Sequence, residues 1–324
     1  MKKVIALSLV LLVGLTGCME KNDESSEKSN DNENAKTQIE LEGVIGTSSF
    51  DKPKEKVVAL EWSIVEELLI SGVQPVGIAD IEGFEKWVKI DAKLDNTVAD
   101  VGNRVEPNIE VIAKLQPDVI IGMKYQEEIL SELEKIAPVV LYDNLDPSAV
   151  EDQYAYTLKT LRDTARIVGK GDDVETEISN FENKLNETKD NIEQLDLNSN
   201  EFVFTQAYSV NQAPTFRIFT TNSAVSHVLE KIGLKNKVLD DPQATSGFIE
   251  SNVEGLVKYQ DALFIHTVQE DDPLFDNLKD NVAWNGLQFV KNNDIYGIGG
   301  GVWTFGSIYS METLINHVTN VIEK

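Results

Sequence analysis

The chain has 324 residues, 41% of them hydrophobic, and a formal net charge of −26. This length is enough for two ordinary domains. The acidity argues against nucleic acid or an anionic membrane surface as the main partner, since both require basic patches. It fits an exported protein, or one that docks onto a basic partner.

Residues 1–17 have the features of an export signal peptide. Lys2 and Lys3 supply positive charge, and the apolar run at 4–15 is too short to span a bilayer. Small residues then precede Cys18, as in the lipobox of bacterial lipoproteins, and no other cysteine is available for a disulfide. We expect Cys18 to be acylated and to anchor the protein at the extracytoplasmic face of the cell membrane, in a Gram-positive cell. An ordinary signal peptide with an incidental cysteine is the alternative.

The segment 18–44 is predicted to be a tether. Between 19 and 37 it consists almost entirely of Glu, Lys, Asn, Asp and Ser, which bury too little apolar surface to fold. About twenty such residues span roughly 25 Å as a flexible coil. We therefore expect the folded part to move near a partner embedded in the membrane.

Residues 45–172 are predicted to form an α/β lobe. Strands are expected at 57–60, 74–79, 98–101, 118–122 and 138–142, and helices at 63–71, 109–115 and 126–136. The stretch around Phe84 and Trp87 is interpreted as loop-rich. Strands interleaved with helices at this spacing are typical of a mainly parallel sheet.

Two amphipathic helices follow, at 151–168 and 173–195. The second has apolar residues at three- and four-residue steps and would be about 35 Å long. Because it lies between two α/β halves, we expect it to bridge them as a stiff strut. An ordinary packed helix is the alternative.

A second α/β lobe is predicted over 196–324. Its strands are expected at 202–206, 216–220, 262–265 and 295–298, and its helices at 223–232, 272–278 and 311–322. The stretch 250–265 repeats 106–121, with six of sixteen positions identical. Each copy has the pattern of an Asn N-cap, a short helix, a turn and a buried strand. The repeat predicts two lobes of similar construction.

The sequence offers little to support an enzyme or a metal held by the protein. His227, His266 and His317 lie in separate elements without ligand spacing, and there is no cysteine pair. The segment 49–52 has the form S-x-x-K without its partner motifs, and the triple glycine at 299–301 is not in a P-loop. We expect no catalytic residues and no protein metal ligands.

The four arginines divide into two groups. Arg162 and Arg166 are four apart on the expected helix 151–168, where solvated or paired roles are ordinary. Arg104 precedes the first repeat helix and Arg217 opens a strand of the second lobe. Arginine binds carboxylates through two parallel hydrogen bonds. Arg104 and Arg217 facing each other across a cleft would suit a polycarboxylate ligand, and surface ion pairs are the alternative.

Three tryptophans stand near strand ends or glycine turns, namely Trp62, Trp87 and Trp303. Such positions are less usual for tryptophan than the core face of a helix. Packing in the core remains the alternative for about half of them.

Four phrases together resemble the iron–siderophore substrate-binding lipoproteins of ABC importers: VVALEWS at 57–63, GVQPVGIAD at 72–80, VGNR at 101–104, and the repeat. The likeness covers about 45–324. Within that family, LEWS, GFEKW at 83–87 and the arginine before the repeat are most similar to ferric citrate binders. The resemblance implies two α/β lobes joined by one long helix, with a ferric siderophore held in the cleft between them. Ferric citrate is the siderophore that the resemblance favours.

The resemblance also implies roles for single residues. Arg104 and Arg217 would bind the chelate's carboxylates with support from Lys124, and Trp62, Trp87 and Trp303 would line the cleft. Glu110 and Glu254, at equivalent places in the two copies, match the pair that docks onto the permease. Their alternative is a helix-dipole contribution of about 0.3–1 kcal/mol. Iron arrives already chelated, so no cofactor or protein metal ligand is implied.

Other interpretations stay open. A catecholate or hydroxamate siderophore, haem or cobalamin could be the ligand in the same role. From other classes, the protein could be a surface hydrolase assembled from distant residues, or an adhesion or scaffold lipoprotein without a ligand. We expect a monomer that works with an iron–siderophore permease and its ATPase.

Overall fold

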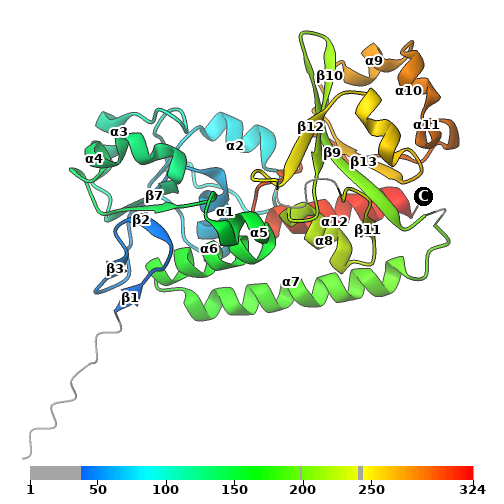
Figure 1. Cartoon of the computed structure of the whole chain (residues 1–324). Helices are drawn as coiled ribbons and strands as arrows, with labels where there is room; N and C mark the ends of the chain where they lie inside the picture. The colour runs from blue at the N-terminus through cyan, green and yellow to red at the C-terminus, as the bar shows by residue number, and fades with distance from the viewer. Residues whose placement is uncertain (1–37, 198, 240–243, 324) are drawn as a thin grey trace, which may run out of the picture. The chain divides into compact units, whose positions relative to one another are not determined.

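The structure is a computed structural model, and it describes residues 38–197, 199–239 and 244–323 (Figure 1). The predicted signal peptide, Cys18 and the tether up to residue 37 lie outside the described residues, whereas residues 38–44 of the predicted tether are described and include β1 (Ile39–Glu40). Within the described ranges, no helix is both long and apolar enough to cross a membrane.

The first lobe is built on a six-stranded sheet with strand order β2-β8-β7-β4-β5-β6. Its strands are β2 (Val44–Gly46), β4 (Val57–Ala59), β5 (Gly77–Ile78), β6 (Ala99–Asp100), β7 (Val119–Met123) and β8 (Val139–Tyr142). All neighbours are parallel except β2, which is antiparallel to β8. β4 and β8 are buried along their whole length and consist of apolar and aromatic residues, as expected for strands covered on both faces. A separate short antiparallel pair, β1 (Ile39–Glu40) and β3 (Ser49–Phe50), lies on either side of β2 in the chain.

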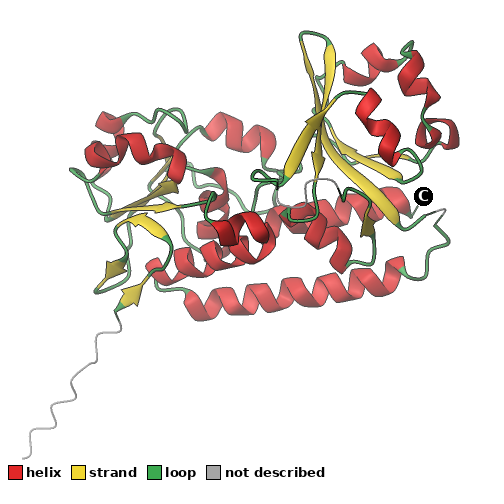
Figure 2. Cartoon of the chain, in the orientation of Figure 1, coloured by secondary structure: helices red, strands yellow, loops and turns green. Residues whose placement is uncertain are grey.

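Helices flank this sheet (Figure 2). They are α1 (Trp62–Ile70), α2 (Ile81–Trp87), α3 (Ile109–Leu115), the 3₁₀ helix η1 (Lys124–Ile129) and α4 (Leu130–Leu133). Two expectations were wrong. The stretch taken as loop-rich is the helix α2, whose N-cap Asp80 accepts a hydrogen bond from Gly83 N at 3.0 Å. The single helix expected at 126–136 is instead a 3₁₀ turn followed by one turn of α-helix.

Three helices connect the lobes: α5 (Pro147–Glu151), α6 (Gln153–Ile167) and α7 (Gly171–Ile192). The helix expected at 151–168 is α6, which begins at Gln153 because Asp152 leaves helical geometry and caps it through Ala155 N at 2.8 Å. α7 is the predicted long helix, and its apolar stripe is buried. It packs against α6, α8 and α12 (Figure 1).

The second lobe is built on a mixed sheet with strand order β12-β10-β9-β13-β14, and β11 also pairs with β9. Its strands are β9 (Glu201–Val210), β10 (Ala213–Phe219), β11 (Lys235–Asn236), β12 (Phe248–Ser251), β13 (Leu263–Thr267) and β14 (Ile295–Gly297). β10 is antiparallel to β9 and β12, whereas β13 is parallel to β9 and β14. Its helices are α8 (Ala224–Lys231), η2 (Glu254–Tyr259), α9 (Leu274–Leu278), α10 (Val282–Gly286), α11 (Gln288–Asn292) and α12 (Ile308–Ile322).

The two copies of the repeat form similar but unequal units. Asn108 caps α3 through Val111 N at 3.1 Å, and Asn252 accepts from Gly255 N at the same distance. Each unit leads into a buried central strand, β7 or β13. The second helix, however, is the 3₁₀ helix η2 rather than an α-helix. Gly255 stands where the first copy has Val111, and glycine is a weak helix former.

The lobes also contact each other directly. Glu66 on α1 accepts hydrogen bonds from Ser310 N and Oγ, both at 2.7 Å, at the start of α12. Lys89, just after α2, donates its backbone N–H to Gly301 O at 2.9 Å. These contacts tie the first lobe to the segment that leads into α12.

Candidate functional site

Arg104 is held against an aromatic surface at the edge of the first lobe. It lies on the loop between β6 and α3, with 28% of its side chain exposed. Its Nη1 donates to Glu61 Oε1 at 2.8 Å. The guanidinium carbon lies 3.7 Å from the ring centroid of Trp62 and 5.7 Å from that of Trp303. One edge of the guanidinium is thus occupied by a carboxylate and one face by an indole.

Strand order explains why these side chains meet. β4 and β7 are neighbouring parallel strands, so the residues that follow them emerge at the same edge of the sheet. Glu61 follows β4, and Tyr125 follows β7 and donates its hydroxyl to Glu61 Oε2. Gln126 is 1% exposed, and its amide donates to Arg104 O at 2.8 Å while its Oε1 accepts from Met123 N at 2.7 Å. Gln126 therefore fixes the Arg104 loop to the end of β7.

Arg217 lies on β10 of the second lobe and is held less tightly. Its Nε is 3.5 Å from Glu250 Oε1, and its Nη1 is 3.5 Å from Gln206 Oε1. The guanidinium carbon lies 4.9 Å from the ring centroid of Phe248 and 5.2 Å from that of Tyr208. Arg217 and Glu250 are direct partners in the register of β10 and β12.

A continuous row of aromatic rings leads from Arg104 to Arg217. The ring centroid of Trp303 lies 5.0 Å from that of Trp62, 6.4 Å from Trp87 and 5.5 Å from Phe305. Phe305 is in turn 6.0 Å from Phe248, which contacts Arg217. The structure therefore brings the three predicted tryptophans together. Trp303 is their meeting point.

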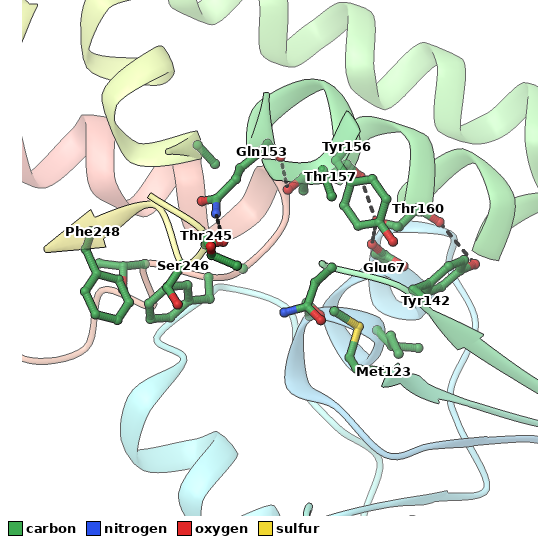
Figure 3. A pocket seen from close by; sticks show the side chains of 18 of the residues that line it. Glu67, Met123, Tyr142, Gln153, Tyr156, Thr157, Thr160, Thr245, Ser246 and Phe248 are labelled. Carbon is green, nitrogen blue, oxygen red and sulfur yellow. Dashed lines mark hydrogen bonds between the residues drawn. The ribbon is translucent and has the colours of Figure 1, made fainter. Parts of the chain in front are cut away.

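Two cavities border this row, and Arg217 lines both. The first has a volume of 350 Å³ and takes its walls from α1, α6, the segment 245–248 and the loop 304–306 (Figure 3). The second, of 530 Å³, lies beside Trp87, Tyr208 and Gln269. Arg104 lines neither cavity and stands at the aromatic row instead.

The first cavity carries polar groups that have no protein partner. The hydroxyls of Tyr156 and Thr304 are buried without a hydrogen bond among the described residues, and both residues line the cavity. Glu67 also lines it, and burial raises the pKa of Glu67 to about 8, against hydrogen bonds from Thr160 and Thr164 at 2.6 Å that lower it. Figure 3 shows Glu67, Tyr142 and Tyr156 on the first-lobe side and Thr245, Ser246 and Phe248 opposite. A ligand there would meet hydroxyl groups as well as rings.

The remaining predicted residues lie apart from this cluster. Lys124 pairs with Asp143 at 2.7 Å, and that hydrogen bond raises the pKa of Lys124. Its ammonium group is directed to Asp143 and forms no hydrogen bond or ion pair with Arg104 or Arg217 in the described part of the chain. Glu110 and Glu254 are exposed, each in the first turn of its helix, α3 and η2.

The described residues contain no group of three or more His, Cys, Asp or Glu side chains that could hold a metal ion. The three histidines have local roles. His227 contacts Asp152 at 2.9 Å, and His317 Nδ1 lies 2.7 Å from Ile298 O. Burial lowers the pKa of His266 to about 4, which keeps it neutral at pH 7.

Residues 57–300 match the periplasmic binding protein family. The chain belongs to this family. It is 27% identical to the Fe(3+)-citrate-binding protein YfmC of Bacillus subtilis, over 96% of this chain and 94% of that protein. It is 23% identical to the iron(3+)-hydroxamate-binding protein FhuD of Escherichia coli, over 82% and 86% of the two chains.

A solved structure supports the same membership. The siderophore-binding protein FhuD from Vibrio cholerae, bound to Fe3+–Desferal, superposes with a TM-score of 0.73 at 25% identity, covering 83% of this chain and 97% of that one. The predicted fold of two α/β lobes is therefore confirmed, and so is the resemblance to siderophore-binding proteins. Members of the periplasmic binding protein family are substrate carriers. The siderophore-binding relatives of this chain bind ferric siderophores as ligands.

Sequence reasoning missed Glu61, Tyr125 and Gln126 as members of the site. A signal for them was present. Ligands of open α/β sheets bind outside the carboxyl ends of the strands, and Glu61 and Tyr125 each stand two residues past the end of a buried strand, β4 or β7.

Proposed function

We propose that this protein captures a ferric siderophore outside the cell membrane and delivers it to an ABC permease. Ferric citrate is the first candidate for the ligand. The observation that carries the proposal is the row of aromatic rings with one arginine at each end, one arginine from each lobe. Similarity to the citrate-binding relative supports citrate as the ligand.

Arginine and indole suit a ferric carboxylate chelate. The edge of Arg104 that is not paired with Glu61 would bind a ligand carboxylate through charge-assisted hydrogen bonds, each worth about 1.5–3 kcal/mol. Arg217 would bind a second carboxylate from the other lobe. The rings of Trp62, Trp87 and Trp303 would cover the chelate's apolar surface, and iron would keep its citrate oxygens as ligands.

Delivery requires an anchor and a docking surface. Acylated Cys18 would supply the anchor, and two relatives from Bacillus subtilis are named as lipoproteins. Glu110 and Glu254, exposed in corresponding first turns, would contact basic residues of the permease, one from each lobe. The strongly acidic chain fits such a partner.

A ferric hydroxamate is the second candidate, and one observation favours it. Three cations at the row or at the cavity beside Trp87 have an acidic partner: Arg104–Glu61, Arg217–Glu250 and Lys86–Asp271. A cleft balanced in this way carries little net charge and would accept an uncharged chelate. The hydroxamate-binding relatives agree with this ligand class.

Titration of tryptophan fluorescence with ferric citrate, a ferric tris-hydroxamate and iron-free citrate tests the proposal. We expect quenching by a ferric chelate, and a loss of affinity of about tenfold or more in Arg104→Ala. Arg162→Ala is the matched control, since Arg162 pairs with Glu175 on α7 away from the row. A protein that responds to no ferric chelate, in fluorescence or in melting temperature, would contradict the function. Equal affinity in Arg104→Ala would remove Arg104 from the site.

A further inference from the structure

Glu61 is a carboxylate at the centre of a site proposed to bind anions, and this position needs an explanation. Its side chain is 10% exposed. A buried acid beside the ligand would repel a polycarboxylate, so a site built only for such a ligand would have an uncharged residue here. The role of Glu61 therefore has to be found in its contacts.

Among the described residues, three donors form hydrogen bonds to the Glu61 carboxylate. Oε1 accepts from Trp62 N at 2.8 Å and from Arg104 Nη1 at 2.8 Å. Oε2 accepts from the Tyr125 hydroxyl. A ligand carboxylate would accept the same kind of charge-assisted hydrogen bond from Arg104. Glu61 therefore already occupies one edge of the guanidinium before a ligand binds.

From this geometry we infer that Glu61 is a specificity-determining residue, an internal counter-ion that neutralises Arg104 and lowers the affinity of the cleft for highly anionic chelates relative to uncharged ones. This inference rests on the proposed function. An uncharged ferric tris-hydroxamate would use the open edge of Arg104 through its oxygens and leave the Arg104–Glu61 pair intact. A multiply charged ferric citrate would meet a cation that is already compensated.

The burial of the pair makes the effect local. Arg104 is covered by Trp62 on one face, and both members of the pair are largely removed from water. Screening by salt is weak for such pairs, whereas exposed charges more than a Debye length away contribute little. Removal of the Glu61 charge should therefore change ligand preference far more than removal of a surface charge.

The test compares the affinities of ferric citrate and of an uncharged ferric tris-hydroxamate for wild type and Glu61→Gln. Glutamine keeps the volume and an acceptor for Trp62 N–H. We expect ferric citrate to bind at least about tenfold tighter to the variant, with the hydroxamate changed by less than about threefold. Glu61→Ser, which keeps a short N-cap acceptor, is the second variant if Glu61→Gln does not fold.

Two controls separate the local effect from net charge. Glu175→Gln removes the acid of an exposed arginine pair and should leave the citrate-to-hydroxamate ratio unchanged. In an Arg104→Ala background, Glu61→Gln should no longer favour citrate, because the arginine that it releases is absent.

Each outcome decides the inference. A shifted ratio in Glu61→Gln that disappears without Arg104 supports it. An unchanged ratio, or an equal shift in Glu175→Gln, overturns it while leaving the proposed function intact. A wild-type protein that binds neither chelate overturns the proposed function, and the role of Glu61 with it.

Discussion

Glu67→Gln is expected to remove a loss of stability that the wild-type protein undergoes as the pH rises from about 4.5 to about 8. Glu67 lies on α1 with 1% of its surface exposed, and its carboxylate accepts the hydroxyls of Thr160 and Thr164. Burial raises its pKa from 4.5 to about 8. Glu66 beside it has its pKa raised to about 7, also by burial.

The direction in which stability changes with pH follows from the number of protons bound by the folded and the unfolded chain. Between pH 4.5 and about 8 the folded protein holds the Glu67 proton more often than the unfolded chain does, so unfolding releases protons. Stability from this group is fully present below pH 4.5 and is lost as the pH rises toward 8. Each pKa unit is worth about 1.4 kcal/mol, so the free energy of unfolding should fall by roughly 3–5 kcal/mol across this window on account of Glu67.

The measurement is urea unfolding of wild type and Glu67→Gln from pH 5 to 9. Glutamine is uncharged and still donates to one threonine and accepts from the other. The variant should therefore match wild type near pH 5, exceed it increasingly as the pH rises to about 8, and keep a constant advantage above that. Glu187→Gln, at an exposed position of α7, is the control and should follow wild type at every pH. A constant difference between wild type and Glu67→Gln across the range would refute the assignment of a raised pKa to Glu67.

Three further predictions concern packing, positioning and docking. Phe181→Ala, at a position of α7 with no exposed surface, should lower the free energy of unfolding by about 3–5 kcal/mol in chemical denaturation. Gln126→Ala leaves Arg104 O and Met123 N unpaired, so it should cost about 1–3 kcal/mol of stability and also weaken chelate binding; unchanged affinity would show that the Arg104 loop needs no such support. Glu110→Ala combined with Glu254→Ala should keep chelate affinity and abolish uptake into cells, and normal uptake would contradict the docking role.

Local sequence patterns determined the identity of most elements. The Asn108 cap and the apolar spacing of 109–115 predicted α3 with its observed bounds, because the cap bond and the helix lie within a few residues of each other. The long apolar stripe predicted α7 to within three residues at each end. Such signals depend on neighbours along the chain, so they survive without any knowledge of the tertiary fold.

Tertiary structure decided what the arginines touch. The sequence placed Arg104 and Arg217 one in each lobe, but Glu61 is 43 residues from Arg104 and Tyr125 is 64 residues from Glu61. These residues meet only because β4 and β7 pair in parallel and end at one edge. The short helices α2 and α5 were also missed, because each depends on a single capping carboxylate, Asp80 or Asp146, rather than on a periodic pattern.

The charge balance of the cleft is where the expectation from the sequence and the structure differ most. From the sequence, two arginines and a lysine predicted a cationic surface for a polycarboxylate. The fold gives each of them a carboxylate partner, from β12, from the end of β8 or from the end of β4. A sequence determines which charges a chain carries and roughly which element carries them. Only the pairing of strands far apart in the chain determines which charges cancel, because electrostatic interaction depends on distance in space.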